Sequence, residues 1–127
     1  MKNEQINITG VVKDETRSTT VKTRIISQGQ QMLRVDEEQS HYINAKVTEE
    51  ILQNVAKAIK NEKIDAIVLE DYNKGLLSES LIQDIINLAR ENGVPVTVDP
   101  KKENFFAYSG VTLFKPNLKE LKALLKF

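Results

Sequence analysis

The stretch Asp65-Ala66-Ile67-Val68-Leu69-Glu70-Asp71 sets four apolar residues between acidic ones and has the length of one buried strand. Ser78 can then cap a helix whose apolar residues recur at spacings of three and four: Leu81, Ile82, Ile85, Ile86 and Ala89. Asn92-Gly93 stops this helix, and apolar runs follow at 94–98 and 111–114. This order predicts a parallel α/β sheet with right-handed crossovers. Because the strands are apolar throughout, we expect both faces of the sheet to be covered.

Two further helices flank the predicted sheet. Upstream, Thr48 can cap a helix with an apolar stripe of Ile51, Leu52, Val55, Ala58 and Ile59. Downstream, Asn117 begins a helix that runs through Leu118, Leu121, Leu124 and Leu125. Residues 41–127 are therefore predicted to form an α/β core, with parallel strands near 65–70, 94–98 and 111–114.

Residues 1–40 have a different pattern, polar and rich in Thr, Gln and Val. Candidate strands are Ile8–Val12, Ser18–Gln28 and Gln30–Asp36, and the last two are joined by a turn at Ser27-Gln28-Gly29. This segment is predicted to be a small antiparallel β lid with one polar face.

The bulk composition limits the function. Eighteen basic and eighteen acidic residues leave a formal net charge of zero, which argues against nucleic acid or a membrane as the partner. The absence of cysteine excludes disulfides and thiolate metal sites. The sequence shows no signal-peptide core and no apolar run of membrane-spanning length, so we expect a cytoplasmic protein.

Polar residues follow each predicted parallel strand. The first strand runs into 70–75, the second ends in Asp99-Pro100-Lys101, and the third ends in Lys115-Pro116-Asn117 with Glu120 one turn later. Ligands of open α/β sheets bind outside the carboxyl ends of the strands, so these clusters predict one binding rim. Each cluster alone is also an ordinary way to leave a strand.

The chemistry of this rim suits phosphoryl transfer. Carboxylates at 71, 99 and 120 provide the oxygen ligands that Mg²⁺ takes, directly or through water. Lys74 and Lys101 can meet phosphate oxygens, and Asn117 lies at a helix start, where free N–H groups favour anions. Positioning and electrostatics carry most of the catalysis in such reactions.

With these residues in view, the chain resembles the ribokinase-like (PfkB) carbohydrate kinases, and within them the heptose-phosphate kinase domain of the ADP-heptose synthesis proteins. Four stretches carry the resemblance: 19–24 with 30–38, Asp71-Tyr72-Asn73-Lys74-Gly75, Val98-Asp99-Pro100-Lys101, and Pro116-Asn117-Leu118-Lys119-Glu120. The resemblance implies a ribokinase-like, Rossmann-like parallel sheet with flanking helices, here as an incomplete domain. It also implies a heptose 7-phosphate 1-kinase that uses ATP and Mg²⁺ in making ADP-heptose, a lipopolysaccharide precursor.

The resemblance also implies site roles. The 117–120 element (Asn117, Leu118, Lys119 and Glu120) would bind ATP phosphates and Mg²⁺ together with Asp99 and Lys101, with Glu120 and Asp99 acting on the metal through water. Asp71 and Lys74 would lie on the sugar side. Lys22, Arg24 and Arg34 would bind the phosphate already on the sugar.

The chain departs from the family pattern in one respect. Family members carry a Gly-x-Gly-Asp segment whose aspartate is the catalytic base, and the five glycines, at 10, 29, 75, 93 and 110, include no such cluster. We therefore expect no catalytic residue among these 127. Two other hypotheses stay open: a fructose-phosphate or ribose kinase of the same fold, and a non-catalytic α/β module for oligomerisation or regulation. Unpaired strand edges also predict a homodimer.

Overall fold

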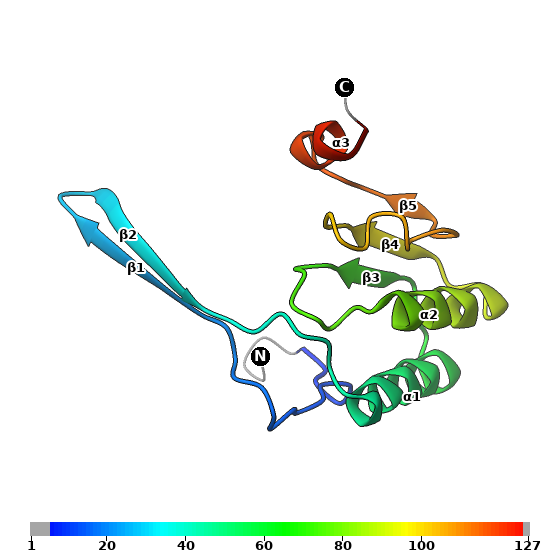
Figure 1. Cartoon of the computed structure of the whole chain (residues 1–127). Helices are drawn as coiled ribbons and strands as arrows, with labels where there is room; N and C mark the ends of the chain where they lie inside the picture. The colour runs from blue at the N-terminus through cyan, green and yellow to red at the C-terminus, as the bar shows by residue number, and fades with distance from the viewer. Residues whose placement is uncertain (1–5, 126–127) are drawn as a thin grey trace.

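The structure, a computed structural model, describes residues 6–125. An α/β body carries a β-hairpin that projects away from it (Figure 1). The elements in chain order are β1 (Val21–Ser27), β2 (Gln30–Glu37), α1 (Ala45–Asn61), β3 (Ile67–Glu70), α2 (Glu79–Glu91), β4 (Val96–Asp99), β5 (Leu113–Phe114) and α3 (Leu118–Leu125). Within the described range, none of the helices has both the length and the apolar character that crossing a bilayer requires.

The body is built on a three-stranded parallel sheet in the order β3-β4-β5. Ile67 pairs with Val96 and Glu70 with Asp99, so β3 and β4 begin and end together. The predicted parallel α/β sheet is confirmed, although each strand is shorter than its apolar run. The early residues of each run form the entry to the strand, and the Pro95 carbonyl accepts a hydrogen bond from the Ile67 N–H (2.9 Å).

Helix α2 forms the centre of the core. Ser78 caps it as predicted, accepting a hydrogen bond from the Leu81 N–H (3.2 Å), and the helix ends before Asn92. Its predicted apolar residues are all buried: Leu81, Ile82, Ile85, Ile86 and Ala89. They pack with Leu69, Val96 and Val98, which alternate along β3 and β4 and therefore point to one face of the sheet.

The opposite face of the sheet is uncovered in the described residues, so the prediction of two covered faces is wrong here. Val68, Thr97 and Leu113 are aligned across the three strands by the pairing register. Val68 is 62% exposed and Leu113 is 55% exposed. A strand that is apolar on both faces can be buried on both, but its sequence does not identify the segment that would cover each face.

Helix α1 begins earlier than predicted. Asn44, and not Thr48, is its N-cap: the Asn44 side chain accepts a hydrogen bond from the Val47 N–H at 3.0 Å. Thr48 lies in the first turn, where its hydroxyl donates to the Asn44 carbonyl. Residues 45–47 can all adopt helical structure, so the helix extends back from Thr48 to the cap at Asn44. Helix α1 packs against α2, and none of its residues is buried.

The antiparallel hairpin β1–β2 is confirmed. Gln28 and Gly29 connect its strands with positive φ at both positions (50° and 78°), the geometry of a type I′ turn. A bulge at Ile25/Ile26 shifts the register. One hairpin face carries Val21, Ile25, Leu33 and Val35, and the other carries Lys22, Arg24, Arg34 and Asp36, because cross-strand partners share a face.

The strand predicted at Ile8–Val12 is absent, and this prediction is wrong. A turn forms there, because the Val11 N–H donates to the Ile8 carbonyl at 3.0 Å. The Asn7 side chain accepts hydrogen bonds from the N–H and hydroxyl of Thr9, and this local bonding competes with extended structure. The boundary predicted at residue 40, between lid and core, stays a prediction.

Gly75 brings two distant segments into direct contact. Its φ is +75°, and a Cβ at this position would lie 1.9 Å from the carbonyl oxygen of His41. Its own carbonyl accepts a hydrogen bond from the Ile43 N–H (2.9 Å). The root of the hairpin, residues 39–43, is therefore docked directly on the loop that follows β3.

Gly75→Ala is expected to lower the free energy of unfolding by about 2–5 kcal/mol. A left-handed alanine costs about 1–2 kcal/mol, and displacing the His41 backbone adds about 1–3 kcal/mol of overpacking. Gly29→Ala is the matched control, since Gly29 has φ +78° but nothing within 4 Å of its added Cβ. Urea unfolding followed by circular dichroism measures both. Equal losses in the two variants would show that the 41/75 contact is not tight.

Candidate functional site

The carboxyl ends of the three parallel strands meet at one edge of the body. The Asp71 N–H donates to the Asp99 carbonyl (3.2 Å), and the Lys115 N–H donates to the Val98 carbonyl (3.0 Å). Helix α3 starts just beyond, at Leu118. The structure thus brings Asp71, Asp99 and the start of α3 to the same edge of the sheet, and their binding roles stay predictions.

The Asp71 carboxylate is buried, with the residue 4% exposed, and it joins three segments. Its Oδ1 accepts the N–H of Asn73 at 2.8 Å. Its Oδ2 accepts both the Asn104 side-chain amide (3.1 Å) and the Tyr108 hydroxyl (2.7 Å). A buried carboxylate is tolerated only when it is hydrogen-bonded, so this cluster fixes the loop after β3 against the loop after β4.

Neither Asn104 nor Tyr108 was among the site residues predicted from the sequence. Burial is the main cause that raises the pKa of the Tyr108 hydroxyl, and its hydrogen bond to Asp71 adds to the effect. Asn104 also donates to the Leu77 carbonyl at 2.8 Å. These partners are more than 25 residues from Asp71 or Leu77 along the chain, and no local pattern marks them.

At the start of α3, Asn117 and Glu120 cap the helix reciprocally. The Glu120 N–H donates to Asn117 Oδ1 (2.9 Å), and the Asn117 N–H donates to Glu120 Oε2 (2.8 Å). The other oxygen of Glu120 accepts a hydrogen bond from Lys101 Nζ at 2.6 Å. Leu118 and Lys119 are exposed between these two capping residues.

The Lys101–Glu120 pair links the exit of β4 to α3. The hydrogen bond from Lys101 lowers the pKa of Glu120, and the Asn117 N–H acts in the same direction. The pKa of Lys101 is raised, chiefly by Glu120 and further by the charges of Asp99 and Asp71. Lys101 is therefore held as a cation among three rim carboxylates.

The rim offers two carboxylates for a metal, Glu120 and Asp99. Lys115 Nζ lies 4.0 Å from Asp99 Oδ2, so each carboxylate already has a lysine beside it. Across residues 6–125, no three histidine or acidic side chains gather closely enough to cage a metal ion. The donor set fits a water-mediated Mg²⁺ that takes further ligands from a substrate phosphate, and it does not fit an ion held by protein alone.

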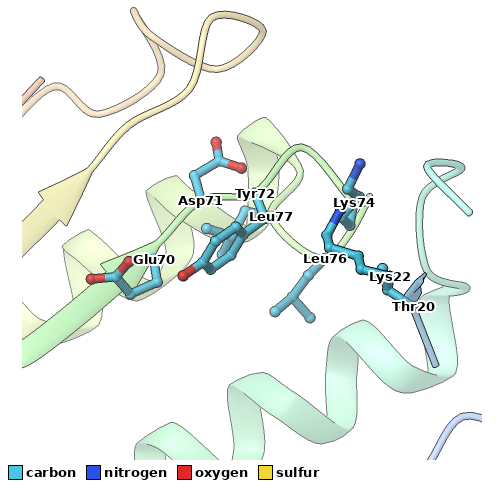
Figure 2. Close-up of a pocket in the computed structure, with 8 residues that line it drawn as sticks. All are labelled: Thr20, Lys22, Glu70, Asp71, Tyr72, Lys74, Leu76 and Leu77. Carbon is cyan, nitrogen blue, oxygen red and sulfur yellow. The ribbon is translucent and has the colours of Figure 1, made fainter. Parts of the chain in front are cut away.

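A pocket of about 500 Å³ opens between the end of β3 and the base of the hairpin. Its lining residues are Thr20, Lys22, Glu70, Asp71, Tyr72, Lys74, Leu76 and Leu77. Figure 2 shows that the pocket is polarised: the carboxylates of Glu70 and Asp71 lie at one side, and Lys22 and Lys74 lie at the other. Such a pocket can receive a ligand with hydroxyls at one end and a phosphate at the other.

The charged face of the hairpin supplies one side of this pocket. Lys22 Nζ lies 3.0 Å from Asp36 Oδ2, and Arg34 Nε lies 3.1 Å from Asp36 Oδ1. The hydrogen bond from Lys22 lowers the pKa of Asp36. Arg24 is directly opposite Arg34 in the register, an unfavourable like-charge pair that an anion would relieve. The structure thus places Lys22 at the pocket and the two arginines further along the same hairpin face.

Two residues outside the predicted set, Glu38 and Arg17, tie the hairpin root to the body. Glu38 Oε1 accepts a hydrogen bond from Lys74 Nζ at 2.5 Å. Arg17 donates to the Gln39 carbonyl (3.0 Å) and to the Lys74 carbonyl. Glu38 lies in a stretch that carried the family resemblance, but no spacing rule predicts its partner 36 residues away.

Curated proteins similar to this chain include bifunctional HldE proteins. The chain is 42% identical over 125 residues to the HldE protein of Helicobacter pylori strain J99, in an alignment that covers 98% of this chain and 27% of that protein. It is also 42% identical over 115 residues to the HldE protein of Sulfurimonas denitrificans, in an alignment that covers 91% of this chain and 24% of that protein. The chain therefore spans about a quarter of the length of these curated relatives.

A solved structure shares the fold. The structure of a possible 1-phosphofructokinase from Thermotoga maritima superposes with a TM-score of 0.59 at 17% identity, over 85% of this chain and 33% of that one. The family model of pfkB family carbohydrate kinases matches residues 1–127. The chain therefore belongs to the pfkB family of carbohydrate kinases.

Proposed function

We propose that this chain forms the acceptor side and part of the nucleotide side of a sugar-phosphate kinase. The acceptor is a heptose 7-phosphate, and its 1-hydroxyl receives the γ-phosphoryl group of ATP on the route to ADP-heptose. The polarised pocket beside the phosphate rim carries this proposal. The identity of about 40% with HldE proteins supports a heptose over a fructose phosphate or ribose.

On the acceptor side, the pocket's two ends suit a phosphorylated sugar. Lys22 and Lys74 provide amino groups for the existing phosphate, and Arg24 and Arg34 extend the positive face. Asp71 and Glu70 lie at the far end, where sugar hydroxyls can donate to carboxylates. The hydrogen bonds around Asp71 hold it in place without side-chain reorganisation, which favours precise positioning of a hydroxyl.

On the nucleotide side, the start of α3 suits ATP phosphates. Asn117, Leu118 and Lys119 lie where a helix presents free N–H groups, and Lys101 adds a fixed cation. Glu120 and Asp99 would hold Mg²⁺ through water, and the metal would neutralise charge on the transferred group. Lys101 then exchanges part of its contact with Glu120 for a phosphate oxygen.

Mg²⁺–ATP is expected to raise the midpoint of thermal unfolding by about 4 °C at ten times its Kd. Binding at that concentration adds about 1.4 kcal/mol. Glu120→Gln keeps the helix cap but removes the charge, and its shift should fall below about half. Glu91→Gln removes the same charge at the C-terminal end of α2, away from the rim, and should leave the shift unchanged. No stabilisation of the wild type would favour the non-catalytic module.

The 127-residue chain by itself is expected to show no kinase turnover. A positioned base contributes about 10²–10⁴ in rate and lost oxyanion donors about 10²–10³, and the Gly-x-Gly-Asp segment that supplies them in the family is not in this sequence. A coupled assay of ADP release with heptose 7-phosphate measures this. Turnover that disappears in Glu120→Gln would contradict the expectation, because a contaminating kinase would not respond to that substitution.

The apolar hairpin face is proposed to be covered by a second copy of the chain. Val21, Ile25, Leu33 and Val35 are 46–51% exposed on a two-stranded ribbon, which is marginally stable without a partner. Two-fold symmetry would cover both copies of this face at once. The opposite hairpin face is charged and is turned toward the pocket.

Ile25→Lys is expected to convert the dimer to a monomer in light scattering at tens of micromolar, because it places a charge in the buried apolar face. Ile26→Lys is the matched control, a neighbouring isoleucine of similar exposure on the other face. It should leave the dimer intact. A wild-type chain that is monomeric at this concentration would overturn the proposal.

A further inference from the structure

Glu38 occupies the two lysines that the proposed ligand phosphate needs. Its Oε1 lies 2.5 Å from Lys74 Nζ, and its Oε2 lies 3.5 Å from Lys22 Nζ. One lysine comes from the hairpin and the other from the loop after β3. The hydrogen bond from Lys74 lowers the pKa of Glu38, so the carboxylate is ionised at neutral pH. A single negative group thus bridges the two parts of the protein across the pocket.

Apart from the contacts of the hairpin root, this bridge is the sole polar tie between residues 21–38 and the α/β body in the part of the chain that the structure describes. Among residues 6–125, no other hydrogen bond or ion pair joins residues 21–38 to the α/β body. Beyond Glu38 the chain is firmly held, since Arg17 binds the Gln39 and Lys74 carbonyls and Gly75 contacts His41. The hairpin is therefore anchored at its root, and only Glu38 fixes its angle to the pocket.

The bridge is also weak enough to be displaced. The side chains of Lys22, Lys74 and Glu38 are 42%, 32% and 31% exposed, and ion pairs in such surroundings contribute little. A phosphate carries nearly two negative charges and three acceptor oxygens, against one charge and two oxygens on Glu38. The charged hairpin face and the loop after β3 together have four cations, Lys22, Arg24 and Arg34 on the hairpin and Lys74 on the loop, against the carboxylates of Asp36 and Glu38. This excess leaves the phosphate better neutralised than the carboxylate it replaces.

We propose that Glu38 is a built-in competitor for the ligand phosphate and a latch for the hairpin. In the free protein, Glu38 holds Lys22 and Lys74 and keeps the pocket open at the observed angle. A phosphate that reaches the two lysines replaces Glu38, and the hairpin is then tied to the body through the ligand. The identity of the phosphate as part of a sugar rests on the proposed function; the competition itself does not.

The test uses the full chain with inorganic phosphate as the probe. Glu38→Gln removes the competing charge and should bind phosphate about two- to fivefold more tightly, read from the amide shifts of Lys22 and Lys74 in an NMR titration. Without phosphate, the same variant should show a hairpin with lower ¹⁵N order parameters. Phosphate should restore them, because it replaces the bridge.

Glu37→Gln is the matched control. It makes the same charge change one residue away, but Glu37 pairs with Val21 on the opposite hairpin face and has no described lysine contact. Its phosphate affinity and hairpin order should match the wild type at physiological salt, where surface charges are screened within about 8 Å. Equal behaviour of Glu38→Gln and Glu37→Gln in both measurements would overturn the latch.

The latch and the proposed function fail in different ways. If Glu38→Gln gains phosphate affinity but heptose 7-phosphate binds no better than inorganic phosphate, the latch stands and the sugar assignment is wrong. If heptose 7-phosphate binds the pocket but removing the Glu38 charge changes nothing, the sugar assignment stands and the latch is overturned.

Discussion

The parallel pairing of β3 with β4 and of β4 with β5 is the constraint on which the rest of the structure depends. Its register ends neighbouring strands together, so the chain must leave the sheet at one edge, and the polar exits of all three strands meet there. The buried Asp71 carboxylate then converts this meeting into a fixed geometry. It accepts hydrogen bonds from Asn73, Asn104 and Tyr108, so the loops after β3 and β4 cannot move independently without leaving a buried charge uncompensated.

The two bridging glutamates of the site, Glu120 and Glu38, differ in how exposed they are and in how many groups hold them. On the proposed nucleotide side, Glu120 accepts a hydrogen bond from Lys101 with one oxygen and from the helix start with the other, and its side chain is 12% exposed. On the proposed acceptor side, Glu38 bridges only the two lysines Lys22 and Lys74, and its side chain is 31% exposed. Under the proposed function, the first arrangement would hold the phosphate-binding groups in fixed positions, and the second would exchange its carboxylate for the ligand phosphate. A kinase needs both properties, because the acceptor must enter and leave while the phosphate-binding groups stay aligned.

Much of the fold could be predicted from the sequence, because short-range rules determine it. The apolar spacing from Leu81 to Ala89, the Ser78 cap and the Gln28-Gly29 turn each lie within one element. The position of the rim followed from strand order. The cap of α1 was misplaced because Asn44 and Thr48 are both good caps. The strand predicted at Ile8–Val12 is absent because the Asn7 side chain accepts hydrogen bonds from Thr9 and favours a local turn. The partners of Asp71 and Glu38 could not be predicted, since Tyr108 and Lys74 reach them only after the chain has folded.

The most direct test of the account is an NMR titration of the chain with heptose 7-phosphate and, in parallel, with the unphosphorylated heptose. The phosphorylated sugar is expected to shift the amides of Lys22, Lys74 and Asp71 together, and the unphosphorylated sugar to bind at least about tenfold more weakly. Equal binding of the two sugars would contradict it. So would shifts confined to the opposite end of the sheet, around Arg90 and Gly93, because the acceptor would then lie away from the polarised pocket.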